Sequence, residues 1–218
     1  MIKFPETTYV NKLVPKNSFY KHLSMNADIK AHFINDIERI VWAYKLAPST
    51  MNVSVGKNVQ EIVVFLIILK EKKCPNDIFI FIDKNIPRHT AFILSYRNEQ
   101  CVLINYKEKN SFNVENPYKV IKTYSSNWLC EDLCSLNIEG SNMDLIYENM
   151  IREVAGSQIM FSTDNLRNDI DESQKRDKII KDIQLLKSKI NAERQPQKKF
   201  LLHKELRDLE NKLNNGIK

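Results

Sequence analysis

Glu61 and Asp83 are the two acidic residues of this sequence that are best placed for hydrolytic chemistry. Metal-dependent nucleases bring two carboxylates and a lysine to the edge of a sheet, where they bind Mg²⁺ and activate water. Such sites take an acid from one strand and a Glu-x-Lys from its neighbour, but the Glu-x-Lys here starts at Glu71, at the exit of an apolar run. A metal-dependent nuclease that uses Glu61, Asp83 and Mg²⁺ is therefore an alternative hypothesis. In the competing interpretation, both acids only hydrogen-bond loops or strand ends.

The polar segment 83–88 follows an apolar run that we expect to be a strand. Polar residues after a buried strand lie at the edge of a sheet, where ligands often bind. The segment could therefore be a binding site. The simpler interpretation is a turn shaped by Pro87, in which Asp83 caps backbone amides.

Cysteine and histidine side chains are the other candidates for metal ligands and nucleophiles in this sequence. Cys130 and Cys134 are four residues apart and could offer two thiolates to zinc, but the chain has no second paired motif for a four-ligand site. His89, beside Arg88 and after Pro87, is the most suggestive single histidine for a nucleophile's partner, but a histidine in a loop is more often merely exposed. Four glycines leave little material for a phosphate-binding loop. We expect no catalytic residues, no metal and no cofactor.

The basic residues are concentrated near the C-terminus. Residues 171–218 contain 13 Lys and Arg against 8 Asp and Glu, whereas residues 1–170 contain 20 against 19. Clustered cations attract nucleic acid or an acidic protein surface, although a solvated helix surface has the same composition. The candidate binding residues are Lys175, Arg176, Lys178, Lys187, Lys189, Lys198, Lys199, Lys204 and Arg207.

Hydrophobic periodicity predicts the elements that must position these residues. Two amphipathic helices are expected at residues 28–46 and 143–154, the second followed by Gly156 as its C-cap. Strands are expected at residues 59–69, 78–82, 91–96, 101–106 and 120–124. The third and fourth strands are separated by a short polar loop and should pair antiparallel. The fold class is α+β, with a mixed four- to five-stranded sheet packed by helices.

A helical hairpin is predicted beyond the sheet. Apolar residues recur at intervals of three and four residues in two short stretches, which is coiled-coil spacing. These residues are Ile179, Ile183, Leu186 and Ile190, followed by Leu202, Leu206, Leu209 and Leu213. Pro196 would interrupt a continuous helix, so an antiparallel hairpin is favoured. We expect an α+β domain at 1–156, a linker at 157–172 and the basic hairpin at 173–218.

The composition places the chain in the cytosol. Hydrophobic residues make up 43% of the sequence, which is enough for a core. The longest apolar run, residues 63–69, is far shorter than a membrane span, and the N-terminus lacks the apolar region of a signal peptide. The four scattered cysteines fit a reducing compartment better than a disulfide framework.

Several short segments occur in an order that resembles a known family. They are residues 14–16, the stretch 33–46 with Trp42, Glu61–Ile62, residues 82–87, and 193–207 with its Glu-Arg-Gln and Lys-Lys-Phe-Leu-Leu motifs. Their order and spacing are similar to those of the domain-of-unknown-function family 4391, over nearly the whole chain. Pro196 and His203 depart from the polar residues expected in relatives. The resemblance implies a bacterial protein whose gene lies near helicases and DNA methyltransferases in restriction or phage-defence neighbourhoods. It implies no catalytic residues.

We therefore expect a non-enzymatic accessory subunit of a bacterial DNA-processing or phage-defence system. Its basic hairpin would dock on a helicase or methyltransferase partner, or on DNA, with the apolar stripes holding the two helices or engaging a partner helix. The alternatives are the nuclease and a self-assembling dimer whose hairpins pair with each other.

Overall fold

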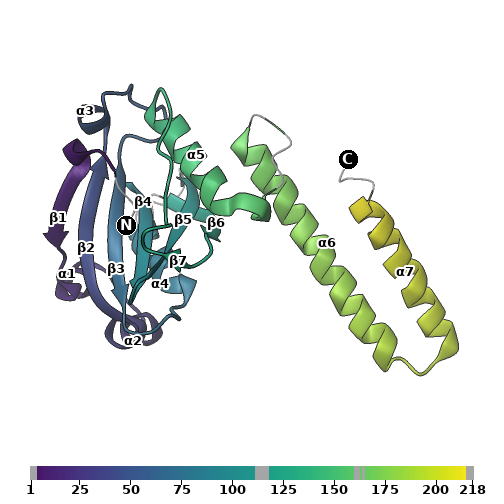
Figure 1. The fold of residues 1–218 in the computed structure, drawn as a ribbon. Coiled ribbons are helices and arrows are strands. Elements are labelled where there is room, and N and C mark those ends of the chain that lie inside the picture. Colours follow the sequence, from purple (N-terminus) through teal and green to yellow (C-terminus); the bar gives the residue numbers. More distant parts are fainter. Residues whose placement is uncertain (1–3, 111–117, 160–162, 164, 215–218) are drawn as a thin grey trace. The chain divides into compact units, whose positions relative to one another are not determined.

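A mixed β-sheet forms the frame of the first part of the chain (Figure 1). The computed structural model describes residues 4–110, 118–159, 163 and 165–214. Its contacts separate two units, Met1–Gly156 and Ser157–Lys218. The strands of the first unit are β1 (Tyr9–Leu13), β2 (Ile37–Leu46), β3 (Ile62–Leu69), β4 (His89–Tyr96), β5 (Glu99–Lys109), β6 (Tyr118–Ser125) and β7 (Leu129–Cys130). Its helices are η1 (Glu6–Thr8), α1 (Lys16–His22), α2 (Ala27–Asn35), α3 (Pro48–Met51), α4 (Asn76–Asn85) and α5 (Met143–Ala155).

The sheet is larger than the predicted four to five strands. Its order is β1-β2-β3-β4-β5-β6, and the short β7 pairs with β5. Every neighbouring pair is antiparallel except β3 and β4, which run parallel. The prediction of a mixed sheet in an α+β fold is confirmed. The additional strands come from residues that the sequence pattern assigns to a helix or to irregular structure.

The helix predicted at residues 28–46 is wrong in its second half. Helix α2 begins after Asn26, whose side chain accepts a hydrogen bond from the Ile29 amide at 2.8 Å, and it ends at Asn35. The chain then continues as β2. Register shifts interrupt the pairing of β2 with β3 at two points, so buried residues do not alternate strictly along the strand. That irregular spacing imitates the period of a helix.

The strand predicted at residues 78–82 is also wrong, because this apolar run forms helix α4. Its buried residues are Ile78, Phe79, Ile82 and Asp83, and this spacing belongs to one helical face. Pro75 precedes the helix, with Asp77 in the first turn and Lys84 in the last. A parallel connection needs a long crossover, and α4 supplies it between β3 and β4.

The remaining predictions of strands and helices in the first unit are confirmed. β4 and β5 form the expected antiparallel hairpin, with Ala91 opposite Ile104, and Arg97 adopts a left-handed conformation at its turn. β3 and β6 occupy the regions expected to be strands. Helix α5 follows the predicted amphipathic pattern and ends at Gly156, whose φ is +48°.

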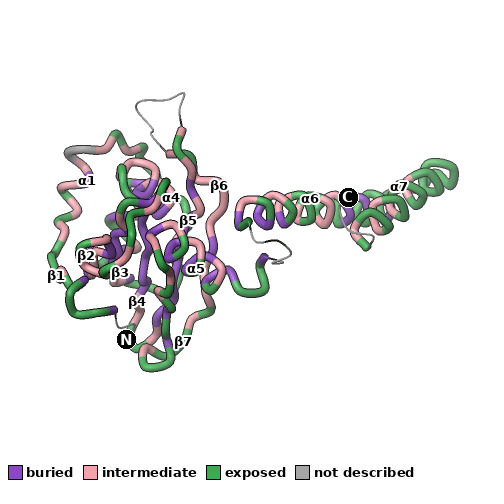
Figure 2. Tube along the Cα trace, turned by 90° about the horizontal axis from the view of Figure 1, so that it is seen from above, coloured by how far each residue is buried: buried purple, intermediate pink, exposed green. Residues whose placement is uncertain are grey.

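Side chains of the central strands alternate between two covered faces of the sheet. One face contributes Phe65, Ile67, Phe92 and Leu103 to a core with residues of α1, α2 and α4. The intervening residues of the same strands, such as Val64, Ile93 and Val102, are also buried. Helix α5 contacts β5 and β6 and buries Ile146, Tyr147, Met150 and Ile151. Buried residues are accordingly concentrated along β3, β4 and β5 in Figure 2.

Two helices, α6 (Leu166–Ala192) and α7 (Pro196–Asn214), form a pair in the second unit after the short η2 (Gly156–Gln158). Helix α6 starts within the expected linker 157–172, where Asn165 caps the Arg167 amide. Pro196 begins α7, which confirms two separate helices. The predicted stripes are the less exposed sides of the two helices, since Ile183, Leu186 and Ile190 are buried and the leucines of α7 are half-buried.

None of the helices of the described residues combines the length and the apolar character that crossing a bilayer requires.

Candidate functional site

A buried ion pair joins Asp83 of α4 to Lys107 of β5. The Lys107 Nζ lies 2.6 Å from Asp83 Oδ1, and both side chains are fully buried. Asp83 is inside because its position falls on the apolar face of α4. Charges are rarely buried without partners, because desolvation costs several kcal/mol per ion. The pair is therefore the most unusual polar feature of the first unit.

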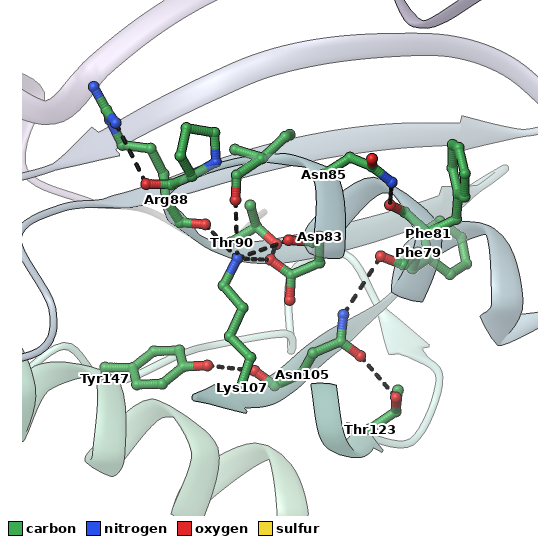
Figure 3. Close-up of polar contacts among 12 residues, drawn as sticks. Phe79, Phe81, Asp83, Asn85, Arg88, Thr90, Asn105, Lys107, Thr123 and Tyr147 are labelled. Atoms are coloured by element: carbon green, nitrogen blue, oxygen red, sulfur yellow. Dashed lines mark hydrogen bonds and ion pairs between the residues drawn. The ribbon is translucent and has the colours of Figure 1, made fainter. Parts of the chain in front are cut away.

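Main-chain carbonyls surround the ammonium group of Lys107 (Figure 3). Its Nζ donates to the carbonyl oxygens of Asp83 at 2.8 Å, Arg88 at 2.5 Å and Ile86 at 3.3 Å. Thr90 donates to Asp83 Oδ1 at 2.5 Å. Burial raises the pKa of the Asp83 carboxyl, and the adjacent Lys107 ammonium opposes that rise. Burial lowers the pKa of Lys107, and Asp83 opposes that change.

Asn105 and Tyr147 continue this polar centre toward α5 (Figure 3). The Tyr147 hydroxyl donates to the main-chain oxygen of Asn105. The Asn105 amide donates to the Phe79 carbonyl at 3.5 Å and accepts from Thr123 at 2.7 Å. Tyr147 is buried, and desolvation raises the pKa of its hydroxyl well above the ordinary value. These contacts connect α4, β5, β6 and α5.

His89, the first residue of β4, lies beside the polar centre. Only 3% of its surface is exposed, and its ring makes edge contacts with Tyr147 at 4.6 Å and Tyr118 at 5.5 Å between centroids. Burial, and secondarily the positive charge of Lys107, lowers its pKa to about 3. The imidazole is therefore neutral at physiological pH.

A cavity of about 350 Å³ opens against His89. Side chains from β5, β6, α5 and the loop before β3 line it, among them Tyr106, Lys107, Lys109, Tyr118, Tyr147 and Glu148. The loop wall is held by Asp144, whose carboxylate accepts from the amides of Lys57 at 2.7 Å, Asn58 at 3.1 Å and Val59 at 2.7 Å. A Cβ on Gly56 would collide with that carboxylate, so the close approach of the loop depends on glycine.

Glu61 and Asp83, the acids of the nuclease hypothesis, belong to different ion pairs. Glu61 is paired with Arg88 and, at 3.2 Å, with Lys45, whereas Asp83 is paired with Lys107. Glu71 lies in the exposed turn after β3. Within the described residues, no group of three or more acidic, histidine or cysteine side chains is arranged to hold a metal ion.

The local structure of the segment 83–88 differs from the expected one, and its role as a binding site stays a prediction. Asp83 and Asn85 still belong to α4, so the segment follows a helix rather than a strand. The Asp83 carboxylate accepts from Lys107 and Thr90 rather than capping backbone amides.

The cysteines that were weighed as zinc ligands differ in exposure. Cys130 is exposed and Cys134 buried, and each has a free thiol. Lys107 was missed as a site residue because it directly follows the predicted strand 101–106. His89 was expected to be an exposed loop residue, but it is buried as the first residue of β4.

The nine predicted binding residues of the helical pair are all exposed. Lys187 of α6 lies 3.0 Å from Glu210 of α7 and bridges the two helices. Near the connection between them, Lys189, Ala192, Lys198, Leu201 and Glu205 are among the residues that line a shallow groove of about 480 Å³. Exposed Phe200 and Leu201 border the same region, and sequence periodicity alone did not single them out.

Comparison with known proteins identifies the family. The model of a domain of unknown function, DUF4391, matches residues 2–213 of the 218-residue chain. No curated protein and no solved structure matches the chain. The match spans both the sheet unit and the helical pair. The chain therefore belongs to the DUF4391 family.

Proposed function

We propose that this protein is a non-enzymatic accessory subunit of a bacterial DNA-processing or phage-defence system. Its helical pair would dock, in the cytoplasm, on a helicase or a DNA methyltransferase, or on DNA beside it. The observation that carries the proposal is the surface of α7, which has no buried residue among those described and exposes an aromatic and an aliphatic side chain among lysines. The class of partner rests on the gene neighbourhoods that the family resemblance implies.

The apolar part of this surface consists of Phe200 and Leu201. Their exposed fractions are 71% and 63%, and neither belongs to the half-buried leucine stripe of α7. Packing of the two helices against each other therefore leaves them in water. Burying a phenylalanine side chain gains about 1.5–3 kcal/mol, and aromatic residues are enriched at the centres of interfaces. A partner that covered both side chains would gain that free energy.

The charged part of the surface surrounds this apolar pair. Lys198, Lys199, Lys204 and Arg207 are exposed on α7, and Lys189 lies in the adjoining groove. Such a cluster attracts an acidic protein surface or DNA phosphates and speeds association. Because apolar and cationic groups occur together, a protein partner with an apolar groove and an acidic rim is favoured over DNA alone.

A variant pair tests the apolar contact directly. Phe200→Ser with Leu201→Ser should abolish binding to the partner while leaving the leucine stripe intact. Leu133→Ser is the matched control, since Leu133 is 71% exposed in the first unit. Affinity purification from the host should recover a helicase or methyltransferase with the wild-type chain and with the control, but not with the double variant. Equal recovery with all three chains would refute docking through α7.

Charge reversal separates a protein partner from DNA. Lys198→Glu with Lys199→Glu removes two cations beside Phe200, and Lys12→Glu with Lys119→Glu makes the same change of net charge at exposed positions of the first unit. If DNA is the ligand, each lost phosphate contact should lower the slope of log affinity against log salt by about 0.9. If a protein is the ligand, oligonucleotide binding should be weak for all of these chains, and partner binding should depend mainly on Phe200 and Leu201.

A second copy of the chain is the competing occupant of the α7 surface. Two apolar residues on each copy could pair around a twofold axis. Sedimentation of the wild-type chain over a wide concentration range decides this question. A constant monomer mass supports docking on a different protein, whereas a dimer that dissociates in the Phe200→Ser, Leu201→Ser variant supports self-assembly.

A further inference from the structure

The imidazole of His89 faces the cavity of the first unit without a hydrogen-bonding partner. Its contacts among the described residues are the two ring contacts with Tyr118 and Tyr147, and no hydrogen bond to its nitrogen atoms is formed there. The residue is 97% buried and lines the cavity wall. Among the described residues, the side-chain polar atoms that are both inaccessible and unpaired do not include the His89 nitrogens, so these nitrogens reach the cavity, where water or a ligand can hydrogen-bond to them.

The strongest charges on the cavity wall are already neutralised by the protein. The Lys107 ammonium is held by Asp83 and three carbonyl oxygens. Asp144 accepts hydrogen bonds from three consecutive amides of the loop. The other charged residues of the wall are Lys109, Glu108 and Glu148, so the wall carries charges of both signs. A strongly charged ligand would meet groups of its own sign, so the wall favours an uncharged one.

The remaining wall is aromatic. Tyr106, Tyr118 and Tyr147 line the cavity together with the His89 ring. The face of Tyr118 carries the Lys107 ammonium 4.5 Å from its centroid, which leaves this ring unsuited to caging a second cation. Aromatic walls with a few polar groups match planar ligands with hydrogen-bonding edges. The volume of about 350 Å³ lies at the small end of ligand sites, which are roughly 300–1,000 Å³.

We propose that this cavity binds an uncharged planar nitrogen heterocycle of the nucleobase class, with His89 hydrogen-bonding to its edge. A neutral imidazole presents one donor and one acceptor nitrogen, and the Watson–Crick edge of every nucleobase carries both kinds of group. Glu148 at the wall can accept from an exocyclic amine. The base could belong to a free nucleoside or to an unpaired nucleotide of a single strand, because both present the same ring.

Calorimetric titration of the full chain tests this site. Adenosine, guanosine, cytidine and thymidine are the first set of ligands, and short single-stranded homopolymers of the same bases are the second. His89→Phe keeps an aromatic ring of similar size but removes both nitrogens. His32→Phe is the control, because His32 lies on α2 and pairs with Asp36 outside the cavity. The ligand that binds should bind about tenfold more weakly to His89→Phe, as expected for one lost hydrogen bond, and unchanged to His32→Phe.

The two ligand sets identify the source of the base. Binding of a nucleoside alone assigns a free metabolite, and binding of a strand that still depends on His89 assigns a nucleic acid. Absence of binding by both sets at millimolar concentration, or equal binding by His89→Phe and wild type, would overturn the proposal. If His89→Phe does not fold, the calorimetric titration is repeated with Glu148→Gln. The imidazole signals of His89 in the wild-type chain are then also followed by nuclear magnetic resonance during the titration. Signals that do not shift on titration would then overturn the proposal.

Discussion

Two buried residues, Lys107 and Asp83, determine how the polar centre of the first unit responds to substitution. Their fully buried side chains are 2.6 Å apart, and the carbonyl oxygens of the segment 83–88 complete the shell of the ammonium. A buried pair contributes little net stability compared with apolar residues of the same volume, but removal of one partner leaves an uncompensated charge. The two residues should therefore be strongly coupled in unfolding experiments.

Single substitutions in this pair should be more damaging than the double substitution. Lys107→Met and Asp83→Leu should each lower the free energy of unfolding by about 3–5 kcal/mol, since each leaves a buried charge. The double variant should lose much less than the two single losses combined. Urea denaturation of the four chains gives these values. Additive losses would mean that the two charges do not interact in the folded protein.

His89 should make the stability depend on pH. Its pKa is lowered to about 3 in the fold, below the value of about 6.5 expected in the unfolded chain. As the pH falls, the His89 imidazole therefore takes up a proton at a higher pH in the unfolded chain than in the folded one. The free energy of unfolding should fall as the pH falls from about 6.5 toward 3, with a slope of up to about 1.4 kcal/mol per pH unit. His89→Phe should lack this component, which is measured as the difference between the two denaturation series. Parallel pH profiles would contradict the burial of a neutral imidazole.

At the scale of elements, the contact between α5 and the loop before β3 depends on one carboxylate. Asp144 is the second residue of α5 and binds three amides of that loop. Asp28 is the second residue of α2, which also begins after an asparagine cap, but Asp28 is exposed and forms no hydrogen bond to a loop of the described residues. The two aspartates thus share a helix position but differ in long-range hydrogen bonds.

Asp144→Asn should therefore destabilise the fold more than Asp28→Asn. Loss of charge-assisted bonds to the loop should lower the free energy of unfolding by about 1.5–3 kcal/mol, while Asp28→Asn should change it by about 0.3–1 kcal/mol through the helix dipole. Hydrogen exchange should also accelerate at the amides of residues 57–59 in Asp144→Asn alone. Unchanged exchange at these amides would show that the loop is held by other contacts.

The sequence was most informative for elements with regular spacing. The hairpin of β4 and β5, helix α5 and the separate helices α6 and α7 followed from simple periods and turn residues. β2 was missed because its bulges disturb the alternation, and α4 because five apolar residues fit a strand or a buried helix equally well. Lys107 could not be recognised as a site residue, because its partner Asp83 meets it only after α4 crosses between two parallel strands.

At the scale of the whole molecule, the two units divide the structural roles. The first unit contains the sheet, the polar centre and the cavity, and its core residues come from its own helices and strands. The second contains the exposed apolar and basic surface of α7. The proposed docking and the proposed ligand site can therefore be tested independently.

A chain that ends at Ile159 should remain folded without the helical pair. It keeps every strand and the complete hydrophobic cluster of the first unit. Cooperative thermal unfolding, followed by circular dichroism, should persist with a helix signal reduced by the loss of α6 and α7. The titrations at the His89 cavity should give the same affinity in this chain as in the full chain. A chain that fails to unfold cooperatively would show that the first unit depends on the second.

The most direct measurement is affinity purification from the native host, with mass spectrometry and nucleic-acid quantification, of the full chain and of the chain that ends at Ile159. The proposed function predicts that a helicase or DNA methyltransferase accompanies the full chain and is absent from the shortened one. Recovery of the same proteins with both chains, or of none with either, would contradict docking through the helical pair.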